Sequence, residues 1–155
     1  MHQEGYMPRL VDTKLETYLR AFGAVSVEGP KWCGKTMTSK EHCNSSILLS
    51  PDEENQNDID LARLKPSLVL QGDVPRLIDE WQEVPELWDV VRNVVDKRKT
   101  PGQFILTGST VVDKERIQHT GAGRFARLSM GTMSLFETGD SSGAVSLASI
   151  FKNEA

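Results

Sequence analysis

The chain carries, between residues 29 and 36, the stretch Gly29-Pro30-Lys31-Trp32-Cys33-Gly34-Lys35-Thr36. Its spacing, G-x-x-x-x-G-K-T, is that of a phosphate-binding loop. The two glycines are expected to let the backbone curl tightly, so that successive N–H groups point at one anion. Lys35 is expected to contact the β- and γ-phosphates of a nucleotide, and the Thr36 hydroxyl to bind Mg²⁺. All eight residues of the loop are therefore predicted to bind the nucleotide.

Because the motif fixes only four positions, its context decides whether it is more than a glycine-containing loop. Residues 24–28 precede it as a short β-prone run, with Val25 and Val27 on one face. Residues 36–42 follow as a predicted helix, whose positive N-terminal end would face the same anion. Strand, glycine loop and helix in this order are the context that the motif requires.

The composition is that of a soluble globular protein of one domain, with 155 residues, 38% of them hydrophobic and 26% charged. A net charge of −4 gives no electrostatic footprint for nonspecific nucleic-acid binding. No apolar run approaches the roughly 20 residues needed to cross a bilayer, and the N-terminus lacks the features of a signal peptide. We therefore expect a cytoplasmic protein without membrane contact.

The apolar pattern predicts alternating helices and strands along the chain. Asp12 or Thr13 is expected to cap a first helix ending near Gly23, with Glu16 completing a capping box. Residues 50–60 are acidic and are interpreted as a solvated loop. Further helices are predicted over residues 61–70, 85–99 and from residue 145 onward, and further strands over 46–49, 75–79, 103–107 and 126–130.

This alternation predicts an α/β sandwich with a mostly parallel sheet. Ligands of such sheets bind at the carboxyl ends of the strands. The phosphate-binding loop, Asp79-Glu80 and residues 107–109 each follow a predicted strand directly. All three polar clusters should therefore gather at one edge of the sheet.

Two carboxylates at that edge have different predicted roles. Asp79, after an apolar strand, has the placement of a Walker B aspartate that holds Mg²⁺. Glu80 is suited to activate an attacking water. The alternative is an acidic helix cap. Thr107 and Ser109 are predicted to sense the γ-phosphate or hold the water, the alternative being ordinary turn polarity.

Arg124 follows Gly121-Ala122-Gly123 and precedes a predicted strand. It is a candidate arginine finger, which stabilises charge on the transferring phosphate. A surface arginine without a catalytic role is the competing interpretation.

Residues 6–137 resemble the ATPase core of bacterial and archaeal AAA-type ATP-binding proteins, which are relatives of AAA+ ATPases. The resemblance rests on the loop, on residues 75–82 and 104–109, on Gly121 to Phe125, and on residues 133–139. It implies a three-layer P-loop NTPase sandwich, with a mostly parallel sheet of five strands in AAA-like order. It also implies ATP and Mg²⁺ as ligands. It also implies that Arg124 acts on the nucleotide of a neighbouring subunit, in a homo-oligomer formed through the ATP site.

The resemblance divides the chain into an entry segment (1–11), an ATPase core (12–137) and the start of a further region (138–155). Complete members of the family carry a C-terminal domain of uncertain function, so the chain is expected to hold the nucleotide site without it. ATP is preferred over GTP on the resemblance alone, since no N-K-x-D sequence is present. A P-loop kinase and a nucleotide-binding switch with negligible turnover remain the alternatives to an ATPase.

Overall fold

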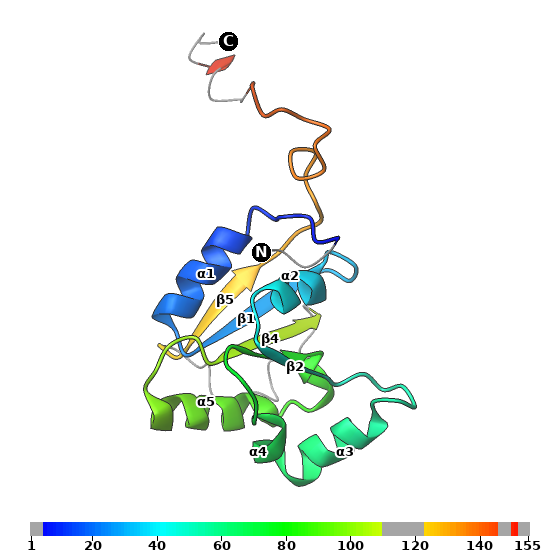
Figure 1. Cartoon of the computed structure of the whole chain (residues 1–155), viewed down its shortest axis with the longest axis vertical. Coiled ribbons are helices and arrows are strands. Elements are labelled where there is room, and N and C mark those ends of the chain that lie inside the picture. The colour runs from blue at the N-terminus through cyan, green and yellow to red at the C-terminus, as the bar shows by residue number, and fades with distance from the viewer. Residues whose placement is uncertain (1–4, 110–122, 146–149, 152–155) are drawn as a thin grey trace.

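The computed structural model describes residues 5–109, 123–145 and 150–151 of the chain (Figure 1). Within these residues one sheet has the strand order β2-β3-β4-β1-β5, and every neighbouring pair is parallel. The strands are β1 Ala24–Gly29, β2 Ser45–Leu48, β3 Arg76–Asp79, β4 Phe104–Ser109 and β5 Phe125–Ser129. The predicted α/β fold with five parallel strands is thereby confirmed.

Helices cover both faces of the sheet and complete a three-layer sandwich (Figure 1). One face is covered by α1 Asp12–Ala21 and α2 Lys35–Glu41. The other is covered by α3 Gln56–Leu64, α4 Pro66–Val69 and α5 Leu87–Arg98, with the 3₁₀ turn η1 Trp81–Glu83 between β3 and α5. In the described residues, no helix has the length and apolar character to cross a membrane.

Three aromatic side chains pack together on the face of the sheet that α5 covers. Trp88 stacks on Phe125 of β5, with ring centroids 4.0 Å apart and planes 12° from parallel. Trp81 packs against Trp88 from the 3₁₀ turn at 5.0 Å. Both tryptophans are buried, so they contribute to the packing of the core.

Helix α3 begins inside the segment that was predicted to be a solvated loop. Residues 56–60 are helical because Ile59 and Ala62, one turn apart, are buried in the core beneath the sheet. Because acidic and polar residues surround these two positions, the apolar pattern of the helix is difficult to recognise in the sequence. The loop prediction for residues 50–60 was therefore wrong over its second half.

The predicted capping box of the first helix is also absent. Helix α1 begins at Asp12 after Val11, and no side chain caps its N-terminus. The Asp12 carboxylate instead accepts hydrogen bonds from the Arg9 N–H at 2.8 Å and from the Tyr6 hydroxyl at 2.7 Å. The helix predicted from residue 145 onward falls mostly outside the described residues.

Candidate functional site

The phosphate-binding loop joins the carboxyl end of β1 to the first residue of α2, Lys35. Gly34 adopts a φ of +97°, a left-handed conformation that side chains rarely take. Gly29 is required for a different reason from the one expected. A Cβ atom there would lie 2.2 Å from the Met130 carbonyl oxygen, so space and not dihedral freedom demands glycine. Trp32 is also left-handed, with a φ of 66°.

Lys35 is buried, and its ammonium folds back over the start of the loop. Its Nζ donates to the carbonyl oxygens of Gly29 at 3.0 Å and of Pro30 at 2.9 Å. Beside it lies a cavity of about 420 Å³. The residues lining this cavity, here called the phosphate cavity, are Lys31, Trp32, Gly34, Lys35, Thr36, Met37 and Glu80.

Asp79, the last residue of β3, is the centre of the predicted metal site. Its carboxylate is buried, and its Oδ1 accepts a hydrogen bond from the Thr36 hydroxyl at 3.1 Å. The Thr107 hydroxyl of β4 donates to the same oxygen. The fold therefore brings together three predicted site residues from three segments that are distant in sequence.

Glu80 leaves the strand in a left-handed conformation, with φ 58° and ψ 42°. Neighbouring side chains of an extended strand point to opposite faces. The turn at Glu80 breaks this alternation, and Glu80 lines the phosphate cavity with Lys35 and Thr36. Its Oε2 accepts a hydrogen bond from Gln82, a residue that the sequence analysis did not assign to the site. A non-glycine residue in this conformation costs about 1–2 kcal/mol, and such strain clusters at functional sites.

Of the two hydroxyl residues predicted at the end of β4, Thr107 and Ser109, the structure describes the side chain of Thr107 alone. The Thr107 hydroxyl is buried, donates to Asp79, and accepts from the Glu80 N–H at 3.4 Å. It therefore joins the two carboxylate residues. Ser109 ends β4 with its backbone opposite Gly29, and its side chain lies outside the described part of the chain.

Arg124 lies at the opposite end of the sheet from the loop. Its carbonyl oxygen accepts from the N–H of Ala24, the first residue of β1, whereas the loop follows the last. The strand between them is roughly 17 Å long at its usual rise per residue. The structure therefore does not bring Arg124 to the phosphate cavity of its own chain.

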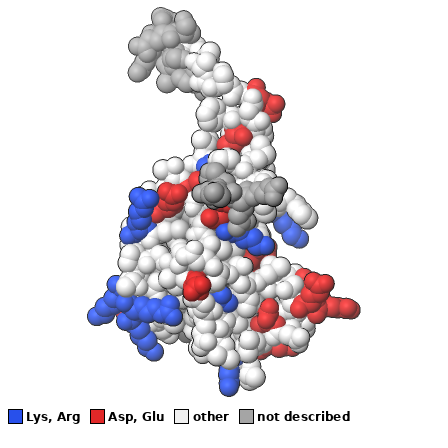
Figure 2. Space-filling model, viewed as in Figure 1, with Lys and Arg blue, Asp and Glu red and all other residues white. Residues whose placement is uncertain are grey.

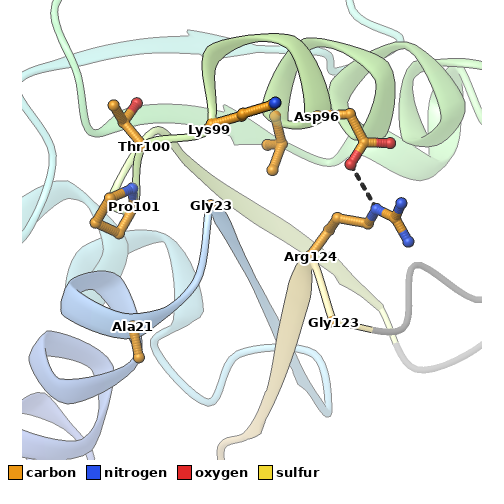
Figure 3. Close-up of a pocket in the computed structure, with 9 residues that line it drawn as sticks. Ala21, Gly23, Asp96, Lys99, Thr100, Pro101, Gly123 and Arg124 are labelled. Atoms are coloured by element: carbon orange, nitrogen blue, oxygen red, sulfur yellow. Dashed lines mark hydrogen bonds and ion pairs between the residues drawn. The ribbon is translucent and has the colours of Figure 1, made fainter.

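Arg124 is one of the residues that line a second cavity, of about 390 Å³, at the C-terminal end of α5, and its side chain points toward Asp96 (Figure 3). Its Nε donates to Asp96 Oδ1 at 2.6 Å, and this hydrogen bond lowers the pKa of the Asp96 carboxyl. Both side chains are about two-fifths exposed. Figure 2 shows basic side chains gathered at this end of α5, where the last turn carries Lys97 and Arg98.

Two features near the loop were not foreseen from the sequence. Arg9 donates from Nη1 to the Cys33 carbonyl oxygen at 2.8 Å, behind the loop. A third cavity, of about 240 Å³, lies against the loop on the side of the entry segment, and Trp32 borders both this cavity and the phosphate cavity. Its lining includes Tyr6, Met7, Met37 and Met133.

The side chains available to bind a metal ion at this site are a hydroxyl and a carboxylate, those of Thr36 and Asp79. Among the described residues, no group of three or more His, Cys, Asp or Glu side chains could hold a metal ion. Thr36 lines the phosphate cavity, and its hydroxyl donates to the buried Asp79 carboxylate. Mg²⁺ characteristically binds one or two protein oxygens and takes its remaining ligands from phosphates and water.

Comparison with known proteins adds a family and a set of relatives. Residues 21–139 match the sequence model of a family described as AAA domain. Uncharacterized protein Rv2008c of Mycobacterium tuberculosis and uncharacterized protein Mb2031c of Mycobacterium bovis are each 30% identical to the chain over 131 residues, 83% of its length. The chain spans 29% of the length of each of these curated relatives.

Two solved structures are also similar, each over 84% of this chain and at 18% identity. One is a RuvB variant of Thermotoga maritima, with a TM-score of 0.44 and 47% of that chain covered. The other is the FIGL-1 AAA domain in complex with ADP, with a TM-score of 0.40 and 51% of that chain covered.

Proposed function

The chain belongs to the AAA domain family, and on that premise we propose that it binds ATP with Mg²⁺ at the phosphate cavity and hydrolyses it. One observation carries the proposal. The hydroxyls of Thr36 and Thr107 donate to the same oxygen of Asp79, beside the phosphate-binding loop. A hydroxyl and a carboxylate next to a glycine loop are what a metal–triphosphate complex requires.

Lys35 would release the two carbonyl oxygens that it now contacts and bind the β- and γ-phosphates. Its stem is already buried under the loop, so only the ammonium needs to reorient. The left-handed turn at Gly34 supports a loop whose N–H groups converge on an anion. The purine ring is proposed to lie in the third cavity, because Met7, Met37 and Trp32 give it apolar and aromatic walls.

Thr36 and Asp79 would hold Mg²⁺, since hydroxyl and carboxylate oxygens are ligands that this ion prefers. When bound, the ion neutralises charge that develops on the β- and γ-phosphate oxygens. Thr107 orients the Asp79 carboxylate by its hydrogen bond. Ser109 is proposed to contact the attacking water or the γ-phosphate.

Glu80 is proposed to be the general base. Its carboxylate borders the phosphate cavity, and Gln82 fixes one of its oxygens. The free oxygen can then accept the proton of a water that attacks the γ-phosphate. Arg124 is proposed to supply charge to the nucleotide of a neighbouring subunit, because it lies at the far end of its own sheet.

The first prediction tests nucleotide binding. We expect Lys35→Ala to abolish measurable ATP affinity in isothermal titration, because the mobile charge that faces the phosphates is lost. Lys65→Ala, an exposed lysine between α3 and α4, is the matched control and should bind as the original chain does. Unchanged ATP affinity in a folded Lys35→Ala variant would overturn the proposed site.

A nucleotide-binding switch is the second candidate function, favoured by the position of Arg124 at the opposite end of the sheet from the phosphate cavity. Phosphate release from ATP, measured with and without small acceptor molecules, separates the possibilities. Release without an acceptor supports an ATPase, transfer to an acceptor supports a kinase, and tight binding without either supports a switch. The isolated chain is expected to bind ATP and to turn it over slowly.

A further inference from the structure

One buried guanidinium joins three separate parts of the chain. Arg9 donates from Nη1 to Cys33 O of the phosphate-binding loop at 2.8 Å. Its Nη2 donates to Gly131 O, after β5, at 2.9 Å, and its Nε donates to Glu137 Oε1 at 3.0 Å. The side chains of Arg9 and Glu137 are each only 6% exposed. Such an ion pair, shielded from solvent, holds its geometry far better than a surface pair does.

Glu137 is itself fixed from several directions. Its Oε1 also accepts from the Leu10 N–H at 2.8 Å. Its Oε2 accepts from the Ser134 N–H at 2.7 Å and from the Ser134 hydroxyl at 2.8 Å. The carboxylate therefore binds both the entry segment and the segment after β5, and it orients the guanidinium between them.

The bond from Arg9 to Cys33 O fixes the orientation of one loop peptide. In a trans peptide the C=O and the N–H that follows it point in opposite directions. Because the Cys33 carbonyl faces Arg9, the Gly34 N–H faces away from Arg9. Gly34 also permits the close approach, since a Cβ atom there would lie 3.0 Å from Arg9 Nη1.

We propose that Arg9, held by Glu137, is a positioning residue for nucleotide binding, which keeps the Cys33–Gly34 peptide in its anion-accepting orientation. This inference rests on the proposed nucleotide function. Energetic coupling between two sites is reciprocal. Nucleotide binding should therefore order the segments that the Arg9–Glu137 pair attaches to the loop, residues 5–11 and 131–137.

The test compares four variants of the whole chain. Arg9→Gln removes the charged guanidinium, and Arg9→Lys keeps the positive charge but has no guanidinium to reach three acceptors. Glu137→Gln keeps the shape of the side chain and removes its charge. Arg20→Gln is the matched control, because Arg20 forms an exposed ion pair with Glu16 on the surface of α1. Amide hydrogen exchange of residues 32–35 and 131–137, without and with MgATP, is measured together with MgATP affinity.

We expect Arg9→Gln to speed exchange of residues 32–35 without nucleotide and to weaken MgATP affinity by about tenfold to a hundredfold, the usual range for a buried charged hydrogen bond. The exchange and the affinity of Arg9→Lys should lie between those of the original chain and those of Arg9→Gln, since one ammonium cannot reach three acceptors. Glu137→Gln should act in the same direction, and Arg20→Gln should change neither quantity. MgATP should slow exchange of residues 131–137 in the original chain and not in Arg9→Gln.

A folded Arg9→Gln chain with the exchange and affinity of Arg20→Gln would overturn the inference. If Arg9→Gln does not fold, unchanged exchange and affinity in both Arg9→Lys and Glu137→Gln overturn it instead. Absence of MgATP binding by the original chain overturns the proposed function. The exchange measured without nucleotide then still decides whether Arg9 positions the loop.

Discussion

Asp79 and Glu80 are adjacent carboxylates in unlike surroundings. Asp79 is buried and accepts two threonine hydroxyls. Glu80 turns out of the strand and borders the phosphate cavity, where Gln82 holds one oxygen. A carboxylate fixed among donors is suited to hold an ion, and one beside open space is suited to accept a proton.

The second prediction separates these roles by variants of nearly equal shape. Glu80→Gln should keep ATP and Mg²⁺ binding and lower hydrolysis by about 10²–10⁴-fold, because an amide cannot accept the proton. Asp79→Asn should instead raise the Mg²⁺ concentration needed for tight ATP binding. Titration calorimetry and phosphate release, both across a Mg²⁺ series, measure these effects. Hydrolysis by Glu80→Gln at the original rate would mean that Glu80 is not the base.

The segments that flank the sheet meet at Glu137, and this contact has a pH dependence. The hydrogen bond from the Ser134 N–H, helped by those from Leu10, the Ser134 hydroxyl and Arg9, lowers the pKa of Glu137 to about 2 from an ordinary value of 4.5. The folded chain therefore binds this proton less readily than the unfolded chain does. The stabilisation is fully present above about pH 4.5 and is lost as the pH falls toward about 2.

The third prediction follows from that sign. The free energy of unfolding of the original chain should exceed that of Glu137→Gln by the largest margin above about pH 4.5, and the margin should shrink as the pH approaches about 2. Urea unfolding at a series of pH values measures it. A margin that stays constant through this pH range would show that the pKa of Glu137 is the same in the folded and in the unfolded chain.

The elements were predictable from the sequence where the determining pattern is local. The glycine loop and the β-prone run before it identify β1 and the start of α2, and a short apolar run ending in Asp79 identifies β3. The start of α3 was missed because only Ile59 and Ala62 carry its apolar face within an acidic segment. The ion pair of Arg9 with Glu137 was missed because the partners are 128 positions apart. Tertiary contacts of that kind leave no periodic signal in a single sequence.

At the scale of the whole molecule, the phosphate-binding loop and Arg124 occupy opposite ends of one parallel sheet. A chain of this design would need a neighbour to bring both to the same nucleotide. The ion pair of Arg124 with Asp96 is about two-fifths exposed, so water screens its attraction. The fourth prediction concerns this arrangement.

In the assembled protein we expect Arg124→Ala to leave ATP binding nearly intact and to lower turnover by as much as roughly 10³–10⁵-fold, the effect of a true arginine finger. Mixing Arg124→Ala with Lys35→Ala subunits should restore part of the activity, since one supplies the cavity and the other the guanidinium. Phosphate release measures the recovery, and light scattering confirms assembly. No recovery in assembled mixtures would mean that Arg124 does not act between subunits.

The unequal exposure of the three tryptophans gives the protein an optical reporter of its own. Trp81 and Trp88 are 2% and 1% exposed, whereas Trp32 is 95% exposed and borders both loop cavities. Iodide should therefore quench the fluorescence of Trp32 selectively. As the fifth prediction, saturating MgATP should protect that emission from iodide, and Trp32→Phe should abolish both the quenching and the protection. Quenching that MgATP leaves unchanged would place the nucleotide away from this indole. A decrease of the quenching with rising MgATP concentration would give the binding curve without any added label.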